Sequence, residues 1–228
     1  MKKIIIFALA ILFISLTCNS VLAAELTRRE VKINSSIKVL EEMASREDHA
    51  GAFGELLQRA EGIVIFPKLV KMGFGFGVQF GEGLVLRKDK NTQKWYGPSF
   101  IDIKTASVGV QAGIQQVSLV LVVMDDVGMA GFKKTDLDIE ANFNIAPGPL
   151  GNSLQADIDF TDSIYTYSYS KGIYAGFTLE GSIIHADRKG NKAFYGRTIT
   201  SKEILDTQET TNEIALKLVE LIESISNK

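Results

Sequence analysis

The sequence predicts an α+β fold, in which a mainly antiparallel β sandwich or barrel-like sheet carries amphipathic helices at its N- and C-terminal ends. Apolar residues recur at helical spacing near both ends, whereas the middle consists of short apolar runs separated by glycine, asparagine or aspartate. No linker divides the chain. We therefore expect a leader over 1–23 and one domain over 24–228, with its core at about 60–196 and flanking helices at about 26–59 and 200–226.

The first 23 residues have the pattern of a secretory signal peptide. Lys2 and Lys3 precede an apolar run, and small residues follow, so cleavage is expected after Ala23. A retained membrane anchor and lipoprotein processing at Cys18 are the alternatives. The prediction is an exported protein of the periplasm or cell envelope, and cleavage after Ala23 would leave it without cysteine.

Two helices are expected before the sheet. Apolar residues at three- and four-residue or heptad spacing predict an amphipathic helix from Leu26 to Ala44. Asp48 offers a cap for a short second helix that ends at Ala60. The residues expected on its buried side are Phe53, Leu56 and Leu57.

Glycine occupies every second position at Gly73, Gly75 and Gly77, with phenylalanine between them. A period of two is typical of a β-strand, and it would place aromatic rings on one face and bare backbone on the other. Glycine weakens a strand, so the alternation indicates a sharp bend or a close backbone approach. A tightly curved sheet corner is one interpretation, and a groove for an acyl chain is the other.

Strand patterns fill the middle of the chain. The run from Val117 to Met124 is almost entirely apolar, which predicts a central strand buried on both faces. Asp89 to Lys94 is expected to be a hairpin connection, and Ala146 to Gly151 a rigid loop. The other expected strands are Gly62–Phe66, Gly73–Phe80, Leu84–Arg87, Ser107–Gly113, Leu137–Phe143, Ile158–Phe160, Tyr165–Ser170, Tyr174–Glu180 and Ser182–Ala186.

Capping-box spacing near the C-terminus predicts two more helices. Thr200 with Glu203 starts a helix to about Asp206, and Thr210 with Glu213 starts a longer one to about Ser226. The apolar stripe expected on the longer helix consists of Ile214, Leu218, Leu221, Ile222 and Ile225.

The sequence offers little for catalysis. His49 and His185 match no zinc or nucleophile motif, and Asp125 and Asp126 are expected to serve turn formation at a strand end. We therefore expect no enzyme activity, no metal and no cofactor. Without Lys2 and Lys3 the formal charge falls from −2 to −4, so no nucleic-acid partner is expected either.

Local cations beside apolar residues are the remaining candidates for a site. Lys68 and Lys71 flank Leu69 and Val70 in an expected loop, and Lys133 with Lys134 follows Phe132. A third cationic group consists of Arg188, Lys189 and Lys192. Such loops suit an anionic lipid surface, where apolar side chains enter the interface and each lysine contributes about 1 kcal/mol.

The order and density of several stretches resemble the SYLF domain family. These stretches are AEGIVIFPKLVKMGFGFGVQFGEGLVLRK, KWYGPSFIDIKTASVGVQAGIQQVSLVLVVMD, IAPGPLG, YTYSYSKGIYAGFTLEGSIIHAD and KAFYG. The resemblance implies a non-catalytic domain that binds anionic phospholipids, and phosphoinositides in eukaryotic members, some of which regulate actin. It supplies no agreed set of contact residues, and export would separate this chain from actin filaments.

The leading hypothesis is therefore an exported lipid-binding module that meets the anionic phospholipid surface of a membrane, with no protein partner identified. An outer-membrane β-barrel, or an envelope structural protein without a specific ligand, is the alternative. For an enzyme, the candidates are Asp125, Asp126 and His185.

Overall fold

A long antiparallel ribbon of two strands forms the centre of the fold in the computed structural model. Strand β1 (Gly62–Lys88) pairs with β2 (Trp95–Val123) from Gly62 opposite Val123 to Lys88 opposite Trp95. In the connection between them the Asp89 carboxylate accepts two backbone N–H bonds, which confirms the expected hairpin turn. The structure describes residues 24–45, 50–138, 144–149, 161–170, 173–174, 179 and 182–227.

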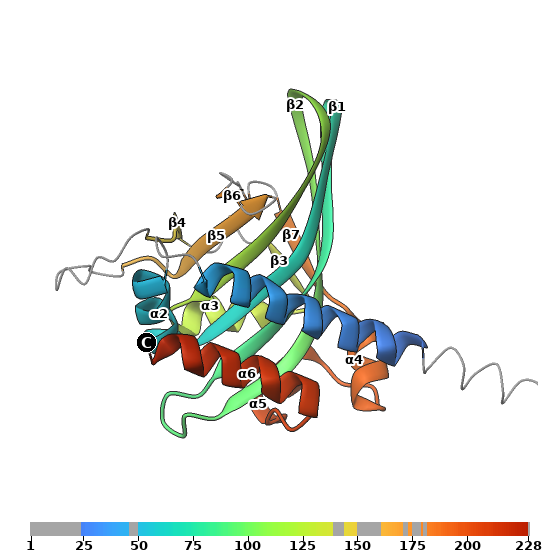
Figure 1. The fold of residues 1–228 in the computed structure, drawn as a ribbon. Coiled ribbons are helices and arrows are strands. Elements are labelled where there is room, and N and C mark those ends of the chain that lie inside the picture. Colours follow the sequence, from blue (N-terminus) through green and yellow to red (C-terminus); the bar gives the residue numbers. More distant parts are fainter. Residues whose placement is uncertain are drawn as a thin grey trace, which may run out of the picture.

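The ribbon folds back on itself at its middle, so that it has two limbs joined by a projecting corner (Figure 1). The first limb comprises residues 62–71 and 115–123, and the second comprises 80–88 and 95–104. The ribbon corner comprises residues 72–79 and 105–114, where the register shifts between Phe74 and Phe76.

The two limbs pack closely because glycines face backbone oxygens across them. A Cβ atom on Gly81 would lie 2.6 Å from the Lys68 carbonyl oxygen, and one on Gly83 would lie 2.6 Å from that of Ile65. The alternating glycines Gly73, Gly75 and Gly77 lie in the ribbon corner between these limbs, where the sheet bends, as one of the two interpretations of the sequence predicted.

The remaining strands extend both limbs into a single curled sheet. Strand β5 (Ile164–Ser170) pairs with β2 along the first limb, with β4 (Ile145–Pro147) and β6 (Ile173–Tyr174) beside it. On the second limb β7 (Ser182–Ala186) pairs with β2, and β3 (Asp136–Asp138) pairs with β7. All pairs except β4 with β5 are antiparallel, which confirms the predicted α+β class.

Helices cover both faces of the sheet. Residues 24–44 are helical and are called the N-terminal helix. This helix packs with α2 (Ala50–Arg59) and α6 (Glu213–Ser226) on one core that includes Leu40, Phe53 and Leu218. The second core lies on the other face and includes residues of α3 (Asp126–Phe132) and α5 (Ser201–Thr207).

Several expected elements are confirmed. Phe53, Leu56 and Leu57 are fully buried, and the run from Val117 to Val123 is buried between β1 and β5 apart from the half-buried Ser118. Thr200 caps α5 through the backbone N–H of Glu203. The predicted strands Tyr165–Ser170 and Ser182–Ala186 are β5 and β7, and both helices expected at the C-terminus are present.

The predicted breaks within the ribbon are wrong, because three expected strands form β1 and two form β2. Pro67 lies at a register shift of β1, where its missing N–H costs no ladder bond. The segment expected to be a loop around Lys68 and Lys71 is therefore strand. Part of the expected loop Ala146–Gly151 is likewise strand, because Ala146 and Pro147 pair with β5.

Two helices were not expected, and one cap was misplaced. Asp125 caps α3, and Asp187 caps α4 (Arg188–Tyr195). Helix α6 begins after Asn212, whose side chain accepts from two backbone N–H groups, whereas Thr210 donates to the Gly97 carbonyl oxygen. The Asp48 cap, Ile158–Phe160, and most of Leu137–Phe143 and Tyr174–Glu180 lie outside the described residues.

Candidate functional site

The N-terminal helix places two cations on its buried face. Only 3% of Arg29 and 6% of Lys32 is exposed. Both charges lie over the ring of Phe100 on β2, at 5.5 Å and 5.7 Å from its centroid. Buried cations are costly unless they are paired, so the acids that meet them decide how the helix is held.

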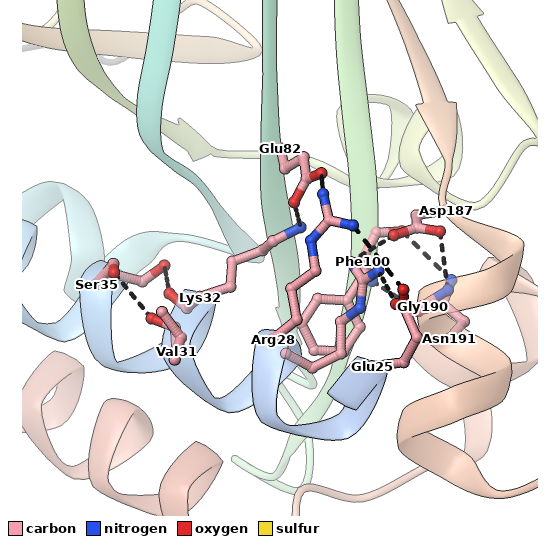
Figure 2. A network of polar contacts seen from close by, with 12 residues as sticks. Glu25, Arg28, Val31, Lys32, Ser35, Glu82, Phe100, Asp187, Gly190 and Asn191 are labelled. Carbon is pink, nitrogen blue, oxygen red and sulfur yellow. Dashed lines mark hydrogen bonds and ion pairs between the residues drawn. The ribbon is translucent and has the colours of Figure 1, made fainter. Parts of the chain in front are cut away.

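Arg29 joins the helix to the start of α4. Its guanidinium lies 2.5 Å from a carboxylate oxygen of Asp187 and 2.9 Å from one of Glu25. Asp187 also accepts the backbone N–H of Gly190, while the Asn191 side chain bonds the backbone of Phe100, as Figure 2 shows. The buried arginine is thus fixed by acids from two elements.

Glu82 of β1 joins the helix to the second limb (Figure 2). Its carboxylate forms an ion pair with Lys32, at 2.7 Å from Nζ, and a second with Arg28. Burial opposes ionisation of Glu82, but the bond from Lys32 and the nearby charges outweigh it and hold its pKa below the usual value. Burial lowers the pKa of Lys32, and Glu82 opposes this shift.

A groove of about 570 Å³ opens above these pairs, between the N-terminal helix and the two limbs of β1. Its charged residues are three cations, Arg28, Lys32 and Lys68, and one acid, Glu82. The volume suits a small organic ligand or part of a larger amphiphile. The remaining lining residues are Val31, Ser35, Pro67, Val70, Phe80, Gly81 and Gln116.

Two of the six residues expected to contact lipid line this groove. Lys68 is exposed, and Val70 is half-buried beside it. Lys71 is half-buried one residue further along β1, at the base of the ribbon corner. Leu69 is fully buried in the second core, because the strand turns its side chain inward, and it is therefore removed from the candidate contact surface.

The other two expected residues lie at a different place. Lys133 follows α3 and pairs with Asp206 of α5 at 2.6 Å, while Lys134 is exposed beside it. Arg188, Lys189 and Lys192 belong to α4. The structure therefore does not bring these groups into the groove with Lys68.

The acids and the histidine considered for catalysis have structural partners. His185 Nδ1 lies 2.7 Å from the Asp136 carboxylate between paired strands, and Asp125 caps α3. Among the described residues, no three histidine, cysteine, aspartate or glutamate side chains are grouped to hold a metal. None of the helices in the described ranges is both long and apolar enough to cross a membrane.

Sequence reasoning missed the contributions of Arg28, Lys32 and Glu82. Arg28 and Lys32 belong to the amphipathic helix predicted from Leu26 to Ala44, whose charged residues were expected to face solvent. The spacing of the charged residues along the helix does not indicate that Lys32 is buried while Arg28 is exposed. Only the fold-back of β1 brings Glu82 to the helix.

The family and sequence comparisons agree with one another. The family model described as "Ysc84: Las17-binding protein actin regulator" matches residues 104–225. The chain is 32% identical over 177 residues to SH3 domain-containing YSC84-like protein 1 of Xenopus laevis, which covers 76% of this chain and 52% of that protein.

Two yeast proteins are also similar to this chain. Protein YSC84 of Saccharomyces cerevisiae is 31% identical, covering 74% of this chain and 37% of its own length. LAS seventeen-binding protein 3 of the same species is 31% identical over 66% of this chain and 34% of that protein. The chain thus spans about half the length of the vertebrate relative and about a third of the yeast ones. No solved structure matches significantly.

Proposed function

Because the chain belongs to the Ysc84 family, whose domain is also called SYLF, we propose that it is an exported, non-catalytic module that binds anionic phospholipids at a membrane surface. The family assignment favours a binding domain whose relatives carry names drawn from actin regulation. The lipid ligand and the exported location are our proposals for this chain.

The composition of the groove is the observation that supports a lipid ligand. The groove lining contains three cations and a single carboxylate, which leaves a local excess of positive charge in a chain whose total formal charge is −2. Val31 and Phe80, which are 58% and 44% exposed, lie in the same lining. Cations next to exposed apolar side chains match a phosphate group and the acyl chains attached to it.

Export is proposed from the pattern of residues 1–23, which lie outside the described part of the chain. Mass spectrometry of the protein from its native envelope tests this step. A mature chain that begins at Ala24 supports cleavage after Ala23, and a mass that includes acylated Cys18 supports lipoprotein processing instead. An unprocessed chain in the cytoplasm contradicts export.

The substitution Lys68→Glu tests the groove as the lipid contact. It removes about 1 kcal/mol of attraction to an anionic surface and adds repulsion of similar size. Binding of the full chain to vesicles of equal parts phosphatidylglycerol and phosphatidylcholine is therefore expected to weaken at least tenfold in co-sedimentation.

The matched control is Lys134→Glu, because Lys134 is also exposed but lies away from the groove. It is expected to change vesicle binding less than threefold. Equal losses in both variants would mean that binding follows total charge, and an unchanged Lys68→Glu variant would exclude the groove as the contact.

A further inference from the structure

The ribbon corner extends away from the helices and from the rest of the sheet (Figure 1). Strand β5 pairs with β2 only from Ser118 to Val123, and β7 pairs with it only from Ile101 to Thr105. Among the described residues, the corner is therefore a two-stranded ribbon with almost no further strand beside it.

The corner contains no charged residue. Neither residues 72–79 nor residues 105–114 include lysine, arginine, aspartate, glutamate or histidine. Among the corner side chains that the structure describes, Ile114 is 78% exposed and Val78 is 45% exposed. Soluble proteins ordinarily protect such edges with charges, because a bare ribbon invites aggregation.

A lysine marks the base of the corner on each limb. Lys71 lies opposite Gln115 on the first limb, and Lys104 lies opposite Phe80 on the second. The middle of the corner lies four to six residues beyond these lysines, which corresponds to about 13–20 Å along the strands at about 3.3 Å per residue. An uncharged tip above two cations has the charge pattern of a segment that enters a bilayer interface.

From this arrangement we propose that the ribbon corner inserts into the interfacial layer of an anionic membrane, with Lys71 and Lys104 at the level of the lipid phosphates. The inference rests on the proposed lipid-binding function and assigns the element that enters the membrane. Insertion stays shallow, because none of the described strands pairs with the outer edges of the corner beyond Thr105, and the backbone N–H and C=O groups there need water or headgroup partners.

The glycines of the corner suit this role. Gly113, which lies opposite Gly73, has a φ of +145°, a value that favours glycine, and a Cβ atom there would meet nothing within 4 Å. The backbone at this position of the corner therefore favours glycine, and no atom of the described residues packs beside it.

An environment-sensitive fluorophore at the corner tests the proposal. Cysteine is introduced by Ile114→Cys in the full chain that also carries Cys18→Ser, and it is labelled with a nitrobenzoxadiazole dye. With vesicles of equal parts phosphatidylglycerol and phosphatidylcholine, its emission is expected to shift to the blue and rise at least twofold. Spin-labelled lipid should quench it.

The matched control is Val127→Cys in the same background. Val127 is 66% exposed on α3, in the body of the molecule, so its label is expected to stay in water and to change little. A second variant, Ile114→Asp, is expected to weaken vesicle binding at least tenfold with an unchanged melting temperature, because it alters an exposed side chain.

Co-sedimentation of the same labelled samples separates the outcomes. Protein that pellets with vesicles while the label at position 114 stays in water overturns insertion and leaves the proposed function standing. Protein that does not pellet overturns both. A blue shift without vesicles that grows with protein concentration assigns the corner to contact with a second copy and overturns the membrane proposal.

Discussion

At the scale of single residues, burial separates two neighbouring arginines. Arg29 is 3% exposed and is paired with Asp187, whose side chain is 12% exposed, whereas the Arg28 side chain is 54% exposed. Breaking a buried pair leaves an uncompensated charge, while an exposed pair contributes little because water screens it. The same residue type therefore has different effects on stability at adjacent positions.

Arg29→Met is expected to lower the free energy of unfolding by about 3 kcal/mol, because Asp187 then stays buried without its cation. Arg28→Met should lower it by about 1 kcal/mol or less. Urea unfolding followed by circular dichroism measures both. Equal losses of unfolding free energy in the two variants would show that the burial of Arg29 does not affect stability.

The ion pairs that join Glu82 to the N-terminal helix are expected to be lost in acid. The pKa of Glu82 lies below 4.5 in the folded protein, so its contribution to stability is complete above about pH 4.5 and is lost as the pH falls through the folded value. Carboxylate chemical shifts measured by NMR should give a midpoint below 4.5, and Lys32→Met should raise it. A midpoint at or above 4.5 in the natural protein contradicts the pairing.

At the scale of elements, local patterns predicted whether most segments are helix or strand, but they did not predict which segments form one continuous strand. Alternation and capping residues are short-range features, and they placed β5, β7 and α5 correctly and α6 with its cap two residues too early. The continuity of β1 through Pro67 depends on its pairing with β2, which no local pattern carries. Helices α3 and α4 are short and contain glycine, so their periodicity was too weak to predict them.

The candidate site was predicted only in part for the same reason. Lys68 and Val70 were found because two lysines flank two apolar residues in a short segment of the sequence. Arg28 and Glu82 are 54 residues apart in sequence and meet only when the ribbon folds back over the helix. Long-range contacts of this kind depend on the fold, and no regular spacing of residues in the sequence indicates them.

Because the two limbs approach closely at Gly81, we expect a side chain at this position to destabilise the fold. Gly81→Ala is expected to lower the free energy of unfolding by about 2 kcal/mol, because its Cβ would meet the backbone oxygen of Lys68 at 2.6 Å. Gly51→Ala is the control, since Gly51 is exposed in α2 and alanine there should stabilise the helix by about 0.5–1 kcal/mol. Thermal unfolding that shifts both variants in the same direction contradicts the close packing of the limbs.

At the scale of the whole molecule, the helices and the sheet contribute different parts of the candidate site. The N-terminal helix, fixed by Asp187 and Glu82, forms one wall of the groove, and the folded ribbon forms the other and extends beyond it as the corner. Groove and corner share the limbs of β1, so a membrane that meets the corner also meets Lys71 and Lys104 at its base. This arrangement supports binding to an amphiphilic surface without reactive side chains.

Vesicle co-sedimentation of the full chain at low and high salt tests this account most directly. We expect binding to vesicles that contain phosphatidylglycerol to exceed binding to pure phosphatidylcholine at least tenfold at low ionic strength. The excess should fall as salt screens the lysines over distances beyond about 10 Å. Equal binding to both kinds of vesicle, unchanged by salt, would contradict recognition of anionic lipid.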